Sequence, residues 1–214
     1  MHLARLQLNP QNADARRDLN SPYDMHRTLQ RAFPGGEPDA NRLLFRIEPS
    51  RPHDTGRTVL VQSSDTPLDL SFLDDAPFAA SRPYCLERQP PKEIHPTLRA
   101  GQQLAFRLLG NPTKKREGRR IALTDEDDYY DWLARKSDLH GFDVLYAHPT
   151  PFWINGDSGA QDTYRKGTIP HFAVRYDGLL RVADPEAVVD TLASGIGPAK
   201  AFGFGLLTLA PPRM

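Results

Sequence analysis

GIGPAKAFGFGLL, residues 195–207, places four glycines around one lysine, Lys200, directly before an apolar run that we expect to form a strand. Nucleotide-binding glycine loops follow a first strand and precede a helix. This segment matches neither G-x-G-x-x-G nor G-x-x-x-x-G-K-[ST], and we therefore expect no nucleotide cofactor. Glycines before a closing strand instead predict a backbone surface held against another part of the molecule.

Outward from this segment, the sequence alternates between strand and helix patterns. Apolar alternation predicts strands over residues 2–8, 43–47, 58–62, 103–109, 120–123, 142–146, 171–176, 178–182 and 206–209. Capping and breaker residues predict helices over 21–33, 125–139 and 184–193, and a short one over 68–75. A turn at Asp177-Gly178 is expected between two of the strands.

The order of these elements divides the chain into two halves. Residues 89–96 hold three prolines and are expected to form a linker between domains at 1–90 and 97–214. Each half combines antiparallel strands with helices on one face. We therefore predict an α+β protein built from tandem ferredoxin-like (RRM-like) domains, the first carrying the helix at 21–33 and the second the glycine-rich segment.

The composition is that of a globular protein, with 39% hydrophobic and 25% charged residues. No apolar run reaches the eighteen or more residues of a membrane span, and no signal peptide begins the chain, so we expect a cytoplasmic protein without a membrane partner. The single cysteine, Cys85, cannot form an internal disulfide. The histidines lack H-x-x-x-H spacing, so no metal site is predicted.

Basic residues cluster between Arg107 and Arg120, although the chain has 27 basic and 27 acidic residues and no net charge. The cluster has two open interpretations, a solvated loop or a positive potential that attracts phosphates. The acidic stretch 125–131 that follows is expected to begin a helix, with Thr124 as its cap.

The helix expected at 21–33 carries the clearest chemical signal. At 100° per residue, Tyr23, His26, Arg27 and Gln30 share one face, while Met25, Leu29 and Ala32 lie opposite. A histidine transfers protons near neutral pH, and a neighbouring arginine holds phosphate. The alternative interpretation is an exposed polar face with an incidental histidine.

Three motifs together resemble one family. PYDMHR at 22–27, FRLLGNPTKK at 106–115 and GIGPAKAFGFGLLTLAP at 195–211 are similar to segments of the CasE family. Members of that family are CRISPR-associated endoribonucleases that cut precursor CRISPR RNA in type I-E systems. The resemblance covers essentially the whole chain, with the motifs in the family's order.

The resemblance implies a metal-independent endoribonuclease without cofactors. It would bind the hairpin of a CRISPR repeat RNA, cleave at the hairpin's 3′ base through the RNA's own 2′-hydroxyl, and leave a cyclic phosphate. The product would stay bound, and the protein would join the other Cascade subunits. A non-catalytic RNA-binding scaffold of the same fold is the alternative hypothesis.

The resemblance also assigns roles to residues of this chain. His26 would be the general acid or base and Tyr23 its partner at the phosphate. The RNA-binding residues would be Arg27, Arg31, Lys114, Lys115, Arg116, Arg119, Arg120, Arg165, Lys166 and Lys200. The structural alternative for Lys200 is a tight turn that packs against the helix at 21–33.

Overall fold

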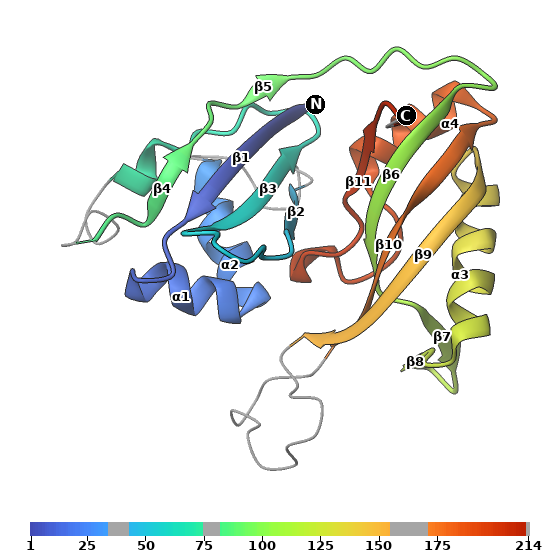
Figure 1. The fold of residues 1–214 in the computed structure, drawn as a ribbon, viewed down its shortest axis with the longest axis horizontal. Helices are drawn as coiled ribbons and strands as arrows, with labels where there is room; N and C mark the ends of the chain where they lie inside the picture. The colour runs from blue at the N-terminus through green and yellow to red at the C-terminus, as the bar shows by residue number, and fades with distance from the viewer. Residues whose placement is uncertain (34–42, 75–81, 155–170, 213–214) are drawn as a thin grey trace. The chain divides into compact units, whose positions relative to one another are not determined.

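The computed structural model describes residues 1–33, 43–74, 82–154 and 171–212 (Figure 1). The chain forms two compact units. Unit 1 comprises Met1–His95 with Lys200–Gly203, and unit 2 comprises Pro96–Ala199 with Phe204–Met214. The division expected from the sequence placed the whole glycine-rich segment in the second domain, whereas four of its residues count with unit 1.

Unit 1 contains a sheet with strand order β2-β3-β1-β4, and the short strand β5 also pairs with β1. All pairings are antiparallel. Its elements are β1 (His2–Leu8), α1 (Ala13–Asn20), α2 (Pro22–Leu29), the 3-10 helix η1 (Gln30–Ala32), β2 (Leu43–Ile47), β3 (Arg57–Ser63), η2 (Ser71–Asp74), β4 (Cys85–Arg88), β5 (Lys92–Glu93) and η3 (Lys200–Phe202).

Unit 2 contains a sheet with strand order β11-β6-β10-β9 and a separate hairpin, β7-β8, again all antiparallel. Its elements are β6 (Gln103–Gly110), β7 (Thr113–Arg116), β8 (Arg119–Ala122), α3 (Glu126–Leu139), β9 (Phe142–Ile154), β10 (His171–Val182), α4 (Pro185–Ser194) and β11 (Leu207–Ala210). No helix among the described residues is both long and apolar enough to cross a membrane.

Both units have the ferredoxin-like topology. Numbering the four main strands of each sheet along the chain gives the same spatial order, 4-1-3-2, with helices between strands. Helices pack on one face of each sheet: Met25 and Leu29 join Leu6 and Phe45 in the core of unit 1. In unit 2, the α3 residue Trp132 stacks on Tyr176 of β10, with ring centroids 5.9 Å apart. The predicted α+β class with tandem ferredoxin-like domains is confirmed.

The predicted turn at Asp177-Gly178 is wrong, because β10 runs unbroken from His171 to Val182. Asp177 lies opposite Arg107 of β6 and forms an ion pair with it. A Cβ atom on Gly178 would lie 2.0 Å from the carbonyl oxygen of Tyr146 in β9. The glycine therefore permits close strand approach, and the dipeptide lies within a strand that pairs on both sides.

Other elements were missed or displaced. Helix α1 was not predicted, and neither were β4, β5 and β7. The N-cap of α3 is Asp125 instead of Thr124. The predicted helix at 21–33 ends at Leu29 and continues as η1, and the one expected at 68–75 is the 3-10 helix η2.

Candidate functional site

Helix α2 presents the predicted polar face. The hydroxyl of Ser21 caps the helix by accepting a hydrogen bond from the backbone N–H of Asp24 (3.3 Å), and Pro22 occupies the first turn. Met25 and Leu29 are fully buried, whereas 60% of Tyr23 is exposed. The hydroxyl of Tyr23 has no hydrogen-bond partner among the described residues. One face of α2 thus fixes the helix in the core and the other offers its side chains to solvent.

His26 lies half-buried on this helix, held by two neighbours. Its ring stacks on Phe45 of β2, with centroids 6.4 Å apart and planes inclined by 27°. Its Nε2 lies 3.2 Å from the side-chain nitrogen of Gln30, one helical turn later. The other ring nitrogen, Nδ1, is buried without a hydrogen-bond partner within the described parts of the chain.

Burial lowers the pKa of His26 below its ordinary value, because desolvation disfavours the imidazolium ion. The neutral ring is therefore the main form at pH 7. At a pH near 7, an uncharged imidazole can accept a proton and return it within one reaction cycle. The ring position, fixed by Gln30 and Phe45, makes His26 a candidate for proton transfer.

The glycine-rich segment reaches the neighbourhood of His26 through Phe45. Gly203 has φ of +84°, a conformation that L side chains rarely adopt, and a Cβ atom there would lie 3.0 Å from Cε2 of Phe45. The 3-10 helix η3, which Lys200 begins, packs against α2 and β2. Lys200 therefore belongs to the same unit as Tyr23 and His26, and its segment packs as the structural alternative expected.

Arg27 and Arg31 differ in their surroundings. Arg27 is exposed and pairs with Asp24 at 3.0 Å. Such surface ion pairs contribute little, so this guanidinium can exchange its carboxylate for a phosphate at small cost. The guanidinium of Arg31 lies 4.8 Å from the ring centroid of Phe72 in η2. The attraction between a cation and an aromatic ring holds this guanidinium beside η2.

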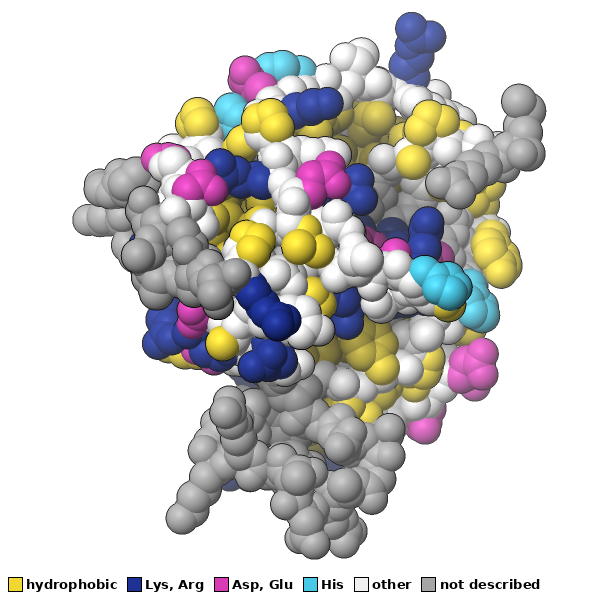
Figure 2. Space-filling model, turned by 60° about the vertical axis from the view of Figure 1, so that its left-hand side comes forward, with side chains coloured by type: hydrophobic (Ala, Val, Ile, Leu, Met, Phe, Trp, Pro, Cys, Tyr) yellow, Lys and Arg dark blue, Asp and Glu magenta, His cyan; other side chains and the backbone are white. Residues whose placement is uncertain are grey.

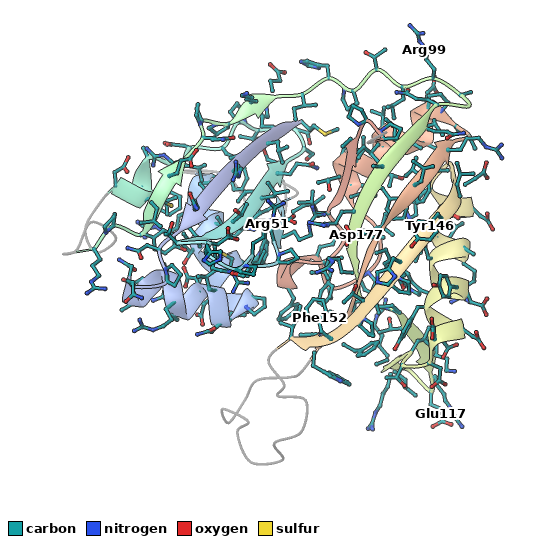
Figure 3. The ribbon with its side chains drawn as sticks, in the orientation of Figure 1. Arg51, Arg99, Glu117, Tyr146, Phe152 and Asp177 are labelled. Atoms are coloured by element: carbon teal, nitrogen blue, oxygen red, sulfur yellow. The ribbon has the colours of Figure 1, made fainter. Side chains whose placement is uncertain are left out.

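Most of the basic cluster of unit 2 lies on a β-hairpin, β7-β8, and not in a loop, whereas Arg107 lies in β6. Glu117 and Gly118 form the turn of the hairpin with φ of +49° and +80°, as a two-residue type I′ connection requires (Figure 3). The strands pair Lys115 with Arg120 and Arg116 with Arg119. Like charges directly opposite each other are unfavourable, so an anion that neutralises them is stabilised there.

All five basic side chains of this hairpin are exposed. They divide between its two faces, because paired residues in an antiparallel hairpin share a face. One face carries Lys115 and Arg120, and the other carries Lys114, Arg116 and Arg119. On the face of the molecule drawn in Figure 2, Lys and Arg lie interspersed with Asp and Glu. This mixture agrees with the equal numbers of basic and acidic residues in the chain.

The remaining candidates are placed as follows. Tyr23, His26, Arg27, Arg31 and Lys200 belong to unit 1, and the hairpin belongs to unit 2. Arg165 and Lys166 lie outside the described residues. Within residues 1–33, 43–74, 82–154 and 171–212, no group of three or more His, Cys, Asp or Glu side chains is placed to hold a metal ion.

Phe45 is the site residue that the sequence did not reveal. It lies within LLFRI, an ordinary apolar strand, and nothing local distinguishes it from Leu43 or Ile47 on the same face. Its contact with Gly203 joins two residues far apart in the chain. An isolated sequence carries no signal for such a pair.

Known proteins resemble this chain over nearly its whole length. A family model described as "CRISPR associated protein" matches residues 1–211. The CRISPR-associated endoribonuclease Cse3 of Thermus thermophilus is 40% identical, covering 99% of this chain and 100% of that protein. The CRISPR system Cascade subunit CasE of Escherichia coli is 32% identical, covering 91% and 93%.

The fold matches as well. The structure of Thermus thermophilus Cse3 bound to an RNA representing a pre-cleavage complex has a TM-score of 0.84 to this chain, with 37% identity and 98% of each chain covered. The match includes both ferredoxin-like units. The chain therefore belongs to the family of CRISPR-associated proteins that includes Cse3 and CasE.

Proposed function

We propose that this chain is an endoribonuclease that binds the stem-loop of CRISPR repeat RNA, cleaves precursor CRISPR RNA, and keeps the product as a Cascade subunit. The names of its relatives, an endoribonuclease and a Cascade subunit, support this assignment. The observation that carries it is the imidazole of His26, fixed by Gln30 and Phe45 one helical turn from the exposed Tyr23.

The proposed reaction needs no nucleophile from the protein. The 2′-oxygen of the RNA attacks the adjacent phosphorus as its proton leaves, and the bond from phosphorus to the 5′-oxygen breaks. The 5′-oxygen takes up a proton, so the products are a 2′,3′-cyclic phosphate and a 5′-hydroxyl. His26 performs one of the two proton transfers, and the hydroxyl of Tyr23 donates a hydrogen bond to the phosphate.

Basic groups supply the remaining parts of the site. Arg27 and Arg31 follow Tyr23 and His26 in the sequence, and their positive charges offset the negative charge of the phosphate. The β7-β8 hairpin follows the phosphates of the RNA stem, because the deep, narrow major groove of A-form RNA prevents side chains from recognising its bases. Lys200, which begins η3 in unit 1, is proposed as a further phosphate contact.

Cleavage of a labelled repeat hairpin in excess chelator tests this proposal. His26→Ala is expected to slow single-turnover cleavage by about a hundredfold or more while hairpin affinity stays nearly unchanged. His95→Ala is the matched control, since that side chain is 79% exposed on the segment after β5. No cleavage by the unmodified protein would favour the non-catalytic scaffold, and an equal loss of affinity would make His26 a binding contact.

Salt dependence tests the hairpin separately. Replacing Lys114, Lys115 and Arg116 by alanine removes up to three phosphate contacts, so the slope of log affinity against log salt should become shallower by about 2–3. The double variant Arg99→Ala/Arg135→Ala is the control, because both residues are exposed elsewhere in unit 2. An unchanged slope in the triple variant would remove the hairpin from the interface.

A further inference from the structure

The sheet of unit 2 has one face that α3 and α4 do not cover. Phe172 and Tyr176 of β10 pack beneath α3. Because side chains alternate along a strand, Arg175, Asp177 and Leu179 point to the opposite face. Their partners in β9 share that face: Thr150 lies opposite Arg175, His148 opposite Asp177 and Tyr146 opposite Leu179.

Aromatic rings line this open face along β9. Tyr146 and Phe152 lie along β9 (Figure 3), and they are 63% and 39% exposed. His148, between them in the sequence, is also exposed. Tyr146 and His148 are two residues apart, which is about 6.8 Å along a strand, and Phe152 follows four residues later. Large exposed rings in such a row are uncommon on a surface that contacts only water, and each offers a π-face to a flat ligand.

Two guanidinium groups accompany the rings. Arg107 of β6 and Arg175 of β10 both donate to the carboxylate of Asp177, which leaves one net positive charge on the trio. Arg175 also lies 3.4 Å from the hydroxyl of Thr150, so its charge sits between His148 and Phe152. The three side chains remain one-quarter to about one-third exposed. The face thus combines stacking surfaces with a modest positive charge.

The outer edge of β9 is unsuited to a protein strand. β9 is an edge strand that pairs with β10 alone in the described sheet, and it contains Pro149 and Pro151. Proline in an edge strand removes donors that an added strand would need. A ligand is therefore expected to approach the face of the sheet and not its edge.

We infer that this face binds single-stranded RNA, namely the nucleotides 5′ of the repeat hairpin, by stacking bases on Tyr146, His148 and Phe152 with a phosphate beside Arg107 and Arg175. We call these five residues the β9 platform. The inference rests on the proposed function for the origin of the RNA. Duplex RNA presents phosphates and hides its base faces, whereas single strands expose bases that stack on aromatic side chains.

The charge distribution separates the two RNA forms within unit 2. The β7-β8 hairpin carries five basic residues and one acidic residue with no exposed aromatic ring, which suits a duplex. The β9 platform carries three rings, and its two arginines share the carboxylate of Asp177, which leaves one net positive charge. This combination suits unpaired bases. The product that the proposed reaction retains keeps its 5′ flank and loses its 3′ flank, so the 5′ side is the one assigned to the platform.

Fluorescence anisotropy with two probes tests the assignment. Both probes are repeat hairpins with a 2′-deoxy nucleotide at the cleavage position, so they stay uncut, and one carries a ten-nucleotide 5′ extension. The unmodified protein should bind the extended probe more tightly. Tyr146→Ala and Phe152→Ala should each weaken binding of that probe about five- to hundredfold, the range for losing one stacked base. Affinity for the blunt probe should be unchanged, and so should the cleavage rate of an all-ribose hairpin without the extension.

Tyr130→Ala is the matched control, because Tyr130 is 42% exposed on α3, on the helical side of the same unit. Equal affinity of the unmodified protein for both probes, or an equal loss in Tyr130→Ala, would overturn the inference. A gain from a 3′ extension in place of the 5′ one would also overturn it. If no hairpin binds, the proposed function fails, and a ten-nucleotide single strand alone then decides the platform by its loss in Tyr146→Ala.

Discussion

Gly203→Ala is expected to weaken the packing beside His26 without touching any reacting group. Gly203 has φ of +84°, and its Cβ position lies 3.0 Å from Cε2 of Phe45. Phe45 in turn stacks on the imidazole of His26. A single added methyl group therefore acts on the proposed proton-transfer residue through one intervening ring.

Two costs add at this position. An L residue at this φ costs about 1–2 kcal/mol. Carbon atoms prefer separations of about 3.5–4.0 Å, so the methyl group must displace the Phe45 ring or the backbone, at a further cost of about 1–3 kcal/mol. The free energy of unfolding should therefore fall by about 2–5 kcal/mol, and the displaced ring should move the imidazole.

Gly101→Ala is the matched control, because Gly101 has φ of +82° and no atom within 4 Å of its Cβ position. That variant bears the conformational cost alone, about 1–2 kcal/mol. Scanning calorimetry compares the two variants, since each kcal/mol of lost stability lowers the melting temperature by about 4–8 °C in a domain of about 100 residues, the size of unit 1. Single-turnover cleavage should slow about tenfold or more in Gly203→Ala, because small misplacements of catalytic groups are costly, and should be unchanged in Gly101→Ala.

The reasoning is refuted if Gly203→Ala loses no more stability than Gly101→Ala, because Phe45 would then yield freely. It is also refuted if stability falls as expected but the cleavage rate does not change. That outcome would mean that the position of His26 does not depend on the ring beneath it.

Three further perturbations have defined outcomes. Burial lowers the pKa of His26, so as pH falls below about 6.5 this histidine binds a proton in the unfolded chain before it does so in the folded chain. The free energy of unfolding, measured by denaturation at pH 7.5 and 5.5, should therefore fall on acidification, and the fall should be smaller in His26→Gln. Tyr84→Phe removes the hydroxyl that donates to the fully buried Asp18 at 2.8 Å, and urea denaturation should show a loss of about 1–3 kcal/mol, whereas no loss would mean that Asp18 is satisfied by Arg17 alone. Gly178→Ala places a methyl group 2.0 Å from the carbonyl oxygen of Tyr146, so calorimetry should show a loss above about 3 kcal/mol, and a silent substitution would contradict the close approach of β9 and β10.

Elements with a complete local signal were predictable. β1 buries Ala4, Leu6 and Leu8 and exposes Arg5, as the alternation in its sequence indicates, and α2 begins where Ser21 and Pro22 predict. The polar face of α2 followed from helical periodicity, which placed Tyr23 and His26 together before any contact was known. The topology then followed, because two halves of mixed strands and helices have few ways to bury their apolar faces.

Elements that depend on distant partners were not predictable. Helix α1 has a polar sequence, ADARRDLN, and its stability comes partly from the buried Asp18, which accepts a hydrogen bond from Tyr84. Asp177-Gly178 resembles a turn locally, but the ion pairs of Asp177 with Arg107 and Arg175 hold it in a strand. The contact of Phe45 with Gly203 is likewise a property of the folded chain and not of either segment.

The return of the chain to unit 1 at Lys200–Gly203 has a consequence for biosynthesis. Gly203 follows His95 by 108 residues. A ribosome that adds roughly 5–20 residues per second therefore adds the segment that packs against Phe45 about 5–20 s after the rest of unit 1. A nascent chain stalled before residue 200 should leave Phe45 accessible to a protease pulse. The packing around Phe45, and with it the support of the His26 ring, is thus complete only after residue 203 has been added to the chain.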